Sequence, residues 1–429
     1  MAKPRGLEQS FRRARVVRPS PITGHEEPEE IILGRFPAFV GRQERTAFEL
    51  MRRSVDEDYV VFLTMSGAMT PAGLHSSCLV PLVERGLVDV ITTTGANLYH
   101  DVHRVIGHQI REIDPNAGDL ALRLSRIIRI YDLGFWENAL LQTDRLLSAV
   151  MTKPHFQRTM TTPELHYLLG REVAALEDAL GVKEPSLLAT AYRHAVPIFV
   201  GAVQDGSIFL NIVQLKRLMP PGSFRLNIDV NDDVFAMGAM QHYCASRAGL
   251  GKRMAIWILG GGVPKNYTLQ GEPLLDQILQ IPAAGFDIDV QFCVDPVDNG
   301  ALSSCSAGEG HTWGKVSPEG VRTSVYCHTD VTGVLPWLTY ALFRDQKRRR
   351  PHRRLMEKLD TAVAMLDAAS RRSLKKLPPL PKALPKDVYQ ALARTAAKPT
   401  VAAGASAPAP KPKPKKAGKK PAKKTPKRK

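Results

Sequence analysis

Six short apolar segments recur along the chain, separated by polar or glycine-rich stretches. Each is rich in β-branched or aromatic residues and is too short for a buried helix. This pattern predicts strands that are covered on both faces of a parallel sheet. The segments lie at residues 58–64, 87–92, 196–203, 252–259, 287–294 and 324–330.

Between and after these segments, apolar residues recur every three or four positions, which is the spacing of one face of a helix. The helices predicted in this way lie at residues 42–55, 120–133, 135–151, 163–180, 186–194 and 355–366. Strands that alternate with helices predict an α/β fold with a doubly wound, mostly parallel sheet and helices on both faces.

Small and polar residues follow several of the predicted strands, notably at residues 66–73, 93–97, 204–207 and 260–266. In an open parallel sheet such loops share the carboxyl edge, where backbone N–H groups and helix N-termini can approach a phosphate. The three glycines at 260–262 suit close approach to a ligand. No Gly-x-Gly-x-x-Gly fingerprint occurs, and Gly251-Lys252 does not belong to a Walker A loop. For each of the first two loops, a plain strand-to-helix turn explains the residues equally well.

Residues 309–315, Glu-Gly-His-Thr-Trp-Gly-Lys, gather groups suited to amine chemistry. Lys315 is a nucleophile only when neutral, so it needs a partly desolvated setting, which the Trp313 face can provide. The indole and Glu309 could also hold a substrate cation. Without further context, a surface turn with one packed tryptophan explains the same residues, and His311 is more readily a structural hydrogen-bond partner than an acid or base.

Charge and composition narrow the class of protein. The net charge is +17, but residues 411–429 hold eleven lysines or arginines and no acid, which leaves +6 for the first 410 residues. The five cysteines are widely spaced with no metal-site spacing, so we expect a reduced cytoplasmic protein without a structural metal. No apolar run reaches membrane-spanning length and the N-terminus lacks a signal sequence, so we expect no membrane segment.

The ends of the chain differ in composition from its middle. We predict an extended arm of mixed charge at residues 1–30, a catalytic domain at 31–345 and a helical, proline-rich extension at 346–395. Residues 396–429 contain almost only lysine, proline, alanine and other small residues, so this tail is predicted to be disordered. It could bind nucleic acid or another polyanion without sequence preference, because no aromatic residue interrupts its lysines. A solvated tail without a partner is an equally good interpretation.

Taken in order, these motifs resemble the deoxyhypusine synthase family, and in particular its bacterial deoxyhypusine synthase-like branch. The resemblance spans roughly residues 30–345 and is most specific at Trp313-Gly314-Lys315 with the upstream Glu309. It implies a Rossmann-like NAD-binding fold, a homotetramer with active sites at subunit interfaces, and an alkyl transferase that acts on a polyamine such as spermidine. Family enzymes oxidise spermidine with NAD and carry the aminobutyl group as an imine on a lysine.

The resemblance also implies roles for individual residues. Lys315 matches the imine-forming lysine, and Glu309 and Trp313 match substrate-channel residues, with Asn266 and His311 beside them. The residues that match NAD-binding positions are Ser66, Gly67, Thr70, Thr94, Gly95, Ala96, Asp205, Gly261 and Asp330.

Three departures from the family pattern concern the substrate. The family's base histidine is Asn266 here, and two ammonium-binding carboxylates correspond to Leu210 and Leu302. Leucine cannot pair with an ammonium, so the accepted amine is expected to differ. The resemblance to the bacterial branch implies that the acceptor is a small amine such as putrescine or agmatine rather than a protein lysine. Two alternatives remain: an NAD- or polyamine-binding protein that has lost turnover, and a basic nucleic-acid-associated protein.

Overall fold

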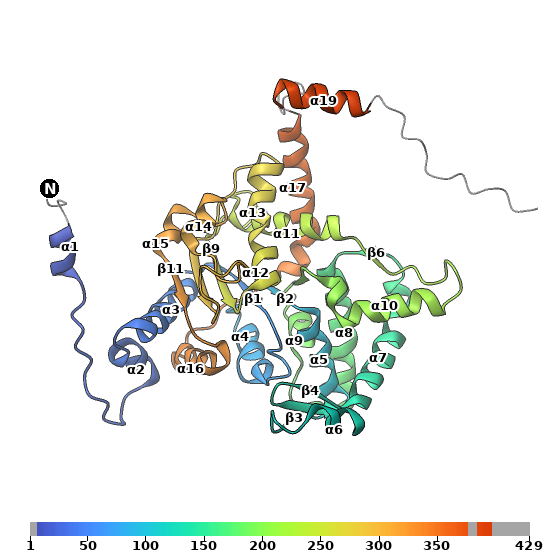
Figure 1. Cartoon of the computed structure of the whole chain (residues 1–429), viewed down its shortest axis with the longest axis horizontal. Coiled ribbons are helices and arrows are strands. Elements are labelled where there is room, and N and C mark those ends of the chain that lie inside the picture. The colour runs from blue at the N-terminus through green and yellow to red at the C-terminus, as the bar shows by residue number, and fades with distance from the viewer. Residues whose placement is uncertain (1–6, 376–383, 397–429) are drawn as a thin grey trace, which may run out of the picture. The chain divides into compact units, whose positions relative to one another are not determined.

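The computed structural model describes residues 7–375 and 384–396, and the chain divides into two units, Met1–Lys375 and Lys376–Lys429, each described by itself. A six-stranded parallel sheet lies at the centre of the first unit (Figure 1). Its strands are β1 (Val60–Met65), β2 (Val90–Thr93), β7 (Ile198–Val200), β9 (Met254–Leu259), β10 (Ile288–Phe292) and β11 (Ser324–Cys327).

The strand order is β11-β10-β9-β1-β2-β7, and every neighbouring pair is parallel. Numbered along the chain, these strands follow the order 6-5-4-1-2-3, which is that of the doubly wound dinucleotide-binding fold. The chain reverses direction across the sheet between β1 and β9, where Val60 pairs with Met254 and Met65 with Leu259. This fold class was predicted and is confirmed. The crevice at the carboxyl ends of β1 and β9 is the expected ligand position.

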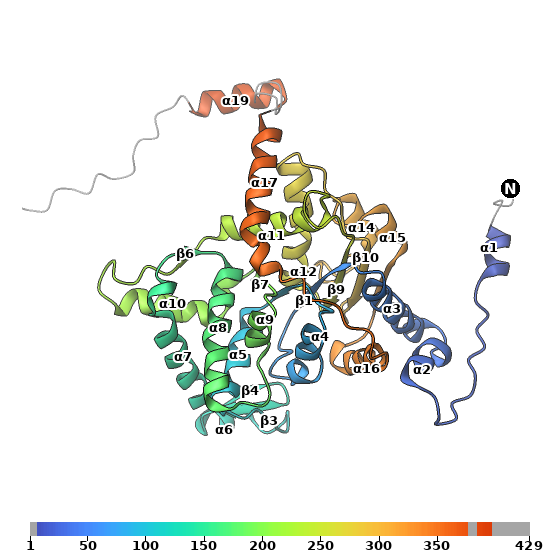
Figure 2. The ribbon, with the colours of Figure 1, turned by 180° about the vertical axis from the view of Figure 1, so that it is seen from behind.

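Side chains of β1 alternate between two apolar cores, because successive residues of a strand point to opposite faces. Val60 and Phe62 belong to one core with α11 (Val230–Ala245), η5 (Leu355–Lys358) and α17 (Leu359–Leu374). Val61 and Leu63 belong to a larger core on the other face. Helices on that face include α3 (Phe39–Asp56), α4 (Val80–Glu84), α5 (Gly95–Val105), α9 (Leu187–Arg193) and α16 (Val331–Arg344). Figures 1 and 2 show the two sets of helices on either side of the sheet.

Most of the predicted helices are present within a few residues of the expected bounds. They include α3, α7 (Glu137–Met151), α8 (Thr162–Leu180) and α9, whereas α17 starts four residues after the start of the helix predicted at 355–366 and ends eight residues beyond it. Local sequence explains the ends of α8. The Thr161 hydroxyl and the Glu164 carboxylate form a capping box at its start, and Gly181 ends it in the left-handed conformation at φ +65°.

The predicted helix at residues 120–133 is wrong. α6 (Asp119–Leu124) ends early, and a small antiparallel sheet follows, with β3 (Arg111–Glu112), β4 (Ile127–Ile130) and β5 (Leu133–Trp136). Arg126 and Tyr131 adopt positive φ angles of 55° and 50°, which interrupt the helix and turn the chain into a hairpin. The three isoleucines of β4 satisfy a helical spacing as well as a strand, so the pattern did not distinguish them.

The N-terminal arm contains more regular structure than predicted. α1 (Leu7–Arg13) precedes an extended segment, and α2 (Pro28–Arg35) begins inside the predicted arm. Pro28 occupies the first turn of α2, and Glu27 and Glu30 form a reciprocal cap. Pro28, within the predicted arm, is buried, and Ile32 of the same helix lies in the larger core, so the end of this arm is part of the folded body.

Residues after the predicted catalytic domain also pack on the body, since Leu355 and Leu359 lie in the core on the α11 side of the sheet. In the second unit, α19 (Lys386–Ala396) is amphipathic. The predictions for residues 397–429 lie outside the described residues. Within the described ranges, no helix combines the length and apolarity needed to cross a bilayer.

The remaining elements connect these layers. They are η1 (His75–Leu79), η2 (Pro154–Phe156), β6 (Thr159–Met160), η3 (Val203–Asp205), α10 (Ser207–Leu218), β8 (Asn227–Ile228), α12 (Gly262–Leu269), α13 (Gly271–Pro273), η4 (Leu274–Ile278), α14 (Ala307–Thr312) and α15 (Pro318–Arg322).

Candidate active site

A cavity of about 190 Å³ lies beyond the carboxyl ends of β1, β2, β7 and β9, at the position predicted for a ligand. We call it the glycine-lined cavity. Most of the residues that line it are small and leave backbone groups accessible. Asp205 contributes its one carboxylate. Its lining residues are Ser66, Thr93, Thr94, Gly95, Ala96, Ala202, Asp205, Gly262, Val263 and Pro264.

Two glycines bring the walls of this cavity together. A Cβ on Gly95 would stand 2.8 Å from Gly206 Cα, and a Cβ on Gly206 would stand 2.9 Å from Gly95 Cα. Both distances are too short for any side chain, so the loops after β2 and β7 can meet only as bare backbone. This contact places Thr94 and Asp205 on one cavity.

Two hydroxyls fix the loops. Ser66 Oγ accepts a hydrogen bond from the Gly261 N–H at 3.2 Å and donates to the Gly261 carbonyl. Thr94 Oγ1 caps α5 by accepting from the Asn97 N–H at 3.3 Å, and it donates to the Gly67 carbonyl at 3.2 Å. Within the described residues, the Asp205 carboxylate has neither a hydrogen bond nor an ion pair, so it is free to accept hydrogen bonds from a ligand.

A second cavity of about 190 Å³ contains the predicted lysine, and we call it the lysine cavity. Gly262 and Pro264 of α12 line the first cavity, and Asn266 of the same helix lines the second, so the two cavities flank α12. The residues that line the lysine cavity are Asn266, Gln270, Leu302, Cys305, Glu309, Gly310, Trp313 and Lys315.

The setting of Lys315 suits a neutral amine. Its Nζ lies 5.7 Å from the centroid of the Trp313 ring, and its backbone N–H donates to the Gly310 carbonyl at 3.0 Å. Burial lowers the pKa of Lys315, and the nearby Lys265 ammonium lowers it further, while Cys305 and Glu309 oppose the shift. A depressed pKa leaves more of the amine unprotonated near neutral pH, which is the form that attacks an electrophilic carbon.

Lys265 lies between the two cavities, almost fully buried. Its Nζ donates to Gln291 Oε1 at 2.7 Å and to the Cys305 carbonyl at 3.0 Å. Gln291 Nε2 in turn donates to the Gly260 carbonyl at 2.9 Å and to the Ser303 carbonyl. This network therefore ties the triple-glycine loop to the loop that borders Lys315.

A buried carboxyl group also lies near this lysine. Burial raises the pKa of Asp289, on β10, to about 6, and the charge of Lys265 partly opposes the shift. The charge of Lys265 therefore acts on both Asp289 and Lys315.

Backbone conformation and a contact within the chain explain the three consecutive glycines at 260–262. Gly260 and Gly262 adopt positive φ angles of 87° and 60°, and a Cβ on Gly261 would stand 2.3 Å from the Ser303 carbonyl oxygen. The close approach that we expected to involve a ligand is thus made by the 303–305 loop.

Five predicted site residues do not line either cavity. The His311 ring Nδ1 lies 2.7 Å from the Val316 carbonyl, which is a structural hydrogen bond. Thr70 is buried, and its hydroxyl donates to the Asn97 carbonyl at 2.6 Å. Asp330 caps α16 through the Thr332 N–H at 2.8 Å. Gly67 and Gly261 support the glycine-lined cavity through their backbone.

The two leucines that correspond to the family's ammonium-binding carboxylates differ in location. Leu302 lines the lysine cavity, whereas Leu210 lies on α10 with 58% of its surface exposed. Sequence reasoning did not select Lys265, Gln291 or Cys305. Asp289 and Gln291, polar residues at alternate positions of an otherwise apolar strand, were the available signal for a buried polar network.

Comparison with known proteins identifies the family. The family model described as deoxyhypusine synthase matches residues 33–342. A "Deoxyhypusine synthase-like protein" from Nostoc punctiforme (strain ATCC 29133 / PCC 73102) is 38% identical over 387 residues, which cover 90% of this chain and 95% of the relative. The chain belongs to the deoxyhypusine synthase family.

As a deoxyhypusine synthase family member, the chain is a transferase of alkyl groups other than methyl. A "Probable deoxyhypusine synthase 2" from Methanosarcina acetivorans is 31% identical over 73% of this chain and 86% of the relative. A crystal structure of a candidate deoxyhypusine synthase from Entamoeba histolytica aligns with a TM-score of 0.50 at 14% identity, over 79% of this chain and 100% of that one, and supports the fold.

Proposed function

We propose that this protein transfers an aminobutyl group from a polyamine such as spermidine, with NAD as cofactor, through an imine on Lys315. The observation that carries the proposal is the position of Lys315, half-buried against Trp313 and separated from the glycine-lined cavity only by α12. The acceptor is a small amine rather than a protein lysine.

The glycine-lined cavity fits NAD in chemical character. Bare backbone at Gly95 and Gly262 permits close approach, and the N-terminus of α5 favours phosphate. Asp205 has the acceptor oxygens that a ribose diol needs. Ser66, Thr94, Gly95, Ala96 and Asp205 would therefore hold NAD. When bound, NAD would accept a hydride from a secondary amine of the substrate, which gives an electrophilic imine, and its reduced form would return that hydride to the imine formed with the acceptor amine.

The residues of the lysine cavity would bind the substrate cation and carry out the transfer. Glu309 binds an ammonium of the substrate, and Trp313 offers its ring face to the same cation. Neutral Lys315 attacks the imine carbon, the amine product leaves, and the aminobutyl group stays on Lys315 until the acceptor amine displaces it. Asn266 can hold a hydrogen bond but cannot take up a proton. Besides Lys315 itself, the residues of this cavity with ionisable side chains are Cys305 and Glu309.

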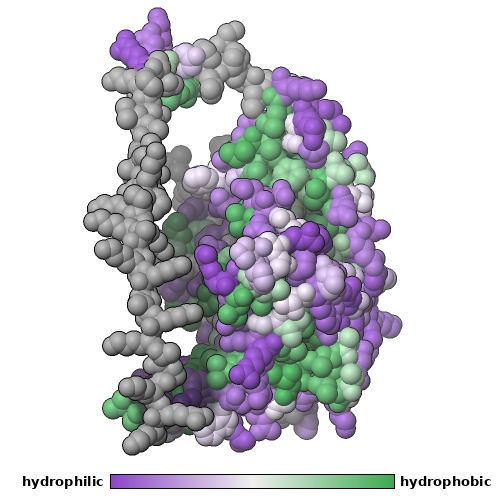
Figure 3. Space-filling model, turned by 90° about the vertical axis from the view of Figure 1, so that its right-hand side faces the viewer, coloured by the Kyte–Doolittle hydropathy of each residue, from purple (hydrophilic) through white to green (hydrophobic). Residues whose placement is uncertain are grey.

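A homotetramer is part of this proposal, since family enzymes complete their sites at subunit interfaces. Figure 3 shows the face that carries α7 and α10, where hydrophobic side chains gather among polar ones. Leu141 of α7 and three residues of α10, Leu210, Val213 and Leu218, are exposed. α10 begins two residues after Asp205. Sedimentation that shows only monomer would contradict this assembly.

The decisive experiment traps the imine. The protein is incubated with NAD and spermidine and then reduced with cyanoborohydride, and the peptides are analysed by mass spectrometry. We expect an aminobutyl adduct on Lys315 that requires both NAD and spermidine. Lys315→Ala should give no adduct, whereas the control Lys216→Ala, which removes a surface lysine bonded to Asn227, should keep it.

A second candidate function follows from Asn266 and Leu302, which place no proton acceptor and no carboxylate at their positions in the lysine cavity. The protein would then bind NAD and a polyamine without turnover. Bound NAD with no adduct on Lys315, for spermidine and for a panel of other polyamines, would favour this alternative.

A further inference from the structure

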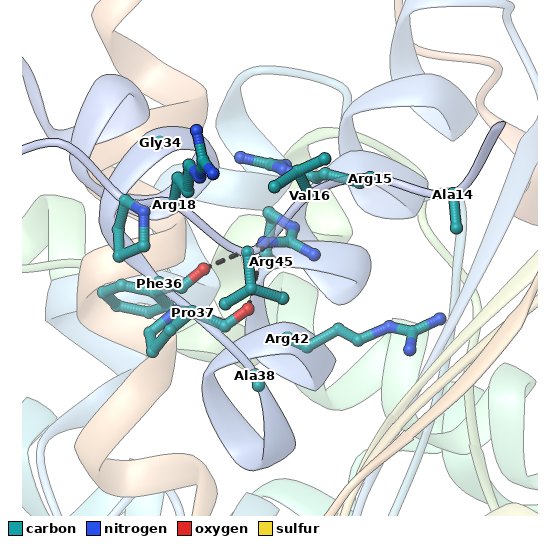
Figure 4. A pocket seen from close by; sticks show the side chains of 12 residues that line it. Ala14, Arg15, Val16, Arg18, Gly34, Phe36, Pro37, Ala38, Arg42 and Arg45 are labelled. Carbon is teal, nitrogen blue, oxygen red and sulfur yellow. Dashed lines mark hydrogen bonds between the residues drawn. The ribbon is translucent and has the colours of Figure 1, made fainter. Parts of the chain in front are cut away.

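A third cavity, of about 220 Å³, is lined by four arginines. We call it the arginine cavity. Arg15 and Arg18 come from the segment after α1, and Arg42 and Arg45 come from the first two turns of α3 (Figure 4). None of its lining residues lines the glycine-lined or the lysine cavity.

The arginine cavity has no counter-charge of its own. None of its lining residues is acidic, and none of the four guanidinium groups forms an ion pair within the described residues. Of the acids of the arm and α2, Glu26 is paired with Arg35 at 3.2 Å and Glu29 with Arg52. Glu49 acts on Arg45 through its charge but forms no ion pair with it.

Two of the arginines are held in place by backbone carbonyls. Arg45 is 8% exposed, and its Nη1 donates to the Phe36 carbonyl at 2.8 Å and to the Pro37 carbonyl at 3.5 Å, as the dashed lines in Figure 4 show. Arg15 Nη2 donates to the Leu33 carbonyl at 2.7 Å. A guanidinium has five N–H donors, so each keeps donors for a ligand.

The electrostatic setting of Arg45 is unfavourable without an anion. Burial lowers the pKa of Arg45, and the charges of Arg15 and Arg42 lower it further. The cavity also lies at the start of α3, whose N-cap Ala38 offers no side-chain acceptor to the first N–H groups. The partial positive charge of that helix end adds to the four arginines.

We propose that the arginine cavity binds a compact phosphate-bearing anion. Guanidinium groups match the oxygens of phosphate in bidentate geometry, and four of them around one small cavity suit a ligand with several phosphate oxygens. This proposal is independent of the reaction at Lys315.

The test uses the full chain with saturating NAD and measures the heat of binding of pyrophosphate, inorganic phosphate, citrate and a hexaglutamate peptide at low ionic strength. The variant Arg15→Ala/Arg42→Ala removes two exposed guanidiniums of the cavity. The control Arg217→Ala/Arg225→Ala removes two exposed arginines elsewhere, with the same change of net charge, and both proteins retain the basic tail.

We expect wild type and control to bind pyrophosphate alike. The cavity variant should bind it at least about tenfold more weakly, because it lacks the charge-assisted hydrogen bonds of two guanidinium groups. Equal binding by the two variants, or no binding by wild type, would overturn the proposal. Preference for citrate or hexaglutamate over pyrophosphate would overturn the assignment to phosphate. If the double variant does not melt like wild type without ligand, Arg42→Ala alone repeats the test.

Discussion

At the scale of single residues, the reactivity of Lys315 depends on the positive charge of a second lysine, Lys265. Lys315 is half-buried beside an indole, whereas Lys265 is almost fully buried and donates to two oxygens. The positive charge of Lys265 disfavours a second ammonium nearby and so lowers the pKa of Lys315. Lys265 is thus a positioning residue that acts through Lys315.

Lys265→Met should raise the pKa of Lys315, because a positive charge that opposes its protonation is removed. Since only neutral Lys315 reacts, the rise of its reactivity with pH should move to higher pH. The measurement is the extent of reductive methylation of Lys315 by formaldehyde and cyanoborohydride across a pH series, which does not require turnover.

Two controls accompany this variant. Lys252→Met removes a lysine that is bonded to Asp58 at 2.6 Å and lines neither cavity, and it should leave the profile of Lys315 unchanged. Lys265→Arg keeps the charge and should shift the profile less than Lys265→Met. An unmoved profile in Lys265→Met would mean that Lys265 serves only to hold the loops.

At the scale of elements, the site depends on loops that touch through bare backbone. The turn between β9 and α12 lies against the 303–305 loop at Gly261, and the turns after β2 and β7 meet at Gly95 and Gly206. A strand fixes only where a loop begins, so these contacts decide whether the two cavities lie side by side.

Gly261→Ala should displace the 303–305 loop, because its Cβ would stand 2.3 Å from the Ser303 carbonyl oxygen. Overpacking of this kind costs about 1–3 kcal/mol of unfolding free energy. Denaturant unfolding measures that loss, and imine trapping on Lys315 should fall with it.

The matched control is Gly300→Ala, in the same connection between β10 and α14, where no atom lies within 4 Å of the new Cβ. Gly300→Ala should have the same free energy of unfolding as wild type and should form the same amount of trapped imine on Lys315. If Gly261→Ala behaved like Gly300→Ala, the contact with Ser303 would not be limiting.

At the scale of the whole molecule, the segment after α16 is joined to the opposite, amino end of the sheet. Asp89 is buried just before β2, and it accepts from Arg350 Nη2 at 3.0 Å and from the Val61 N–H at 2.8 Å. Arg353 Nε lies 3.3 Å from the same carboxylate. The basic run that ends at Arg350, in the extension predicted at residues 346–395, is therefore part of the folded body.

Asp89→Asn should destabilise the protein by about 3–5 kcal/mol, because it leaves two arginine side chains without their buried counter-ion. The control Asp367→Asn breaks an exposed pair with Arg371 and should cost less than about 1 kcal/mol. Chemical denaturation compares the two variants. Losses of similar size would show that Asp89 does not anchor the segment.

Several features followed from the sequence alone. The six strands and the fold class depend on local period and apolar runs, which are properties of neighbouring residues. The order of the small-residue loops and the Trp313-Gly314-Lys315 element pointed to the family that the comparisons confirm. The error at residues 120–133 arose because a short isoleucine-rich segment fits both helix and strand.

Only the tertiary structure decided which groups meet. Lys265 lies 26 positions before Gln291 and 40 before Cys305, and Gly95 lies far from Gly206 in sequence, so no local pattern could pair them. The four arginines of the arginine cavity likewise come from two separate segments, and their lack of counter-ions depends on which acids Arg35 and Arg52 have already paired. Residue type and spacing determine local structure and the kinds of chemistry that the side chains could carry out. Packing determines which charges are buried together, and burial sets their pKa values and hence their reactivity.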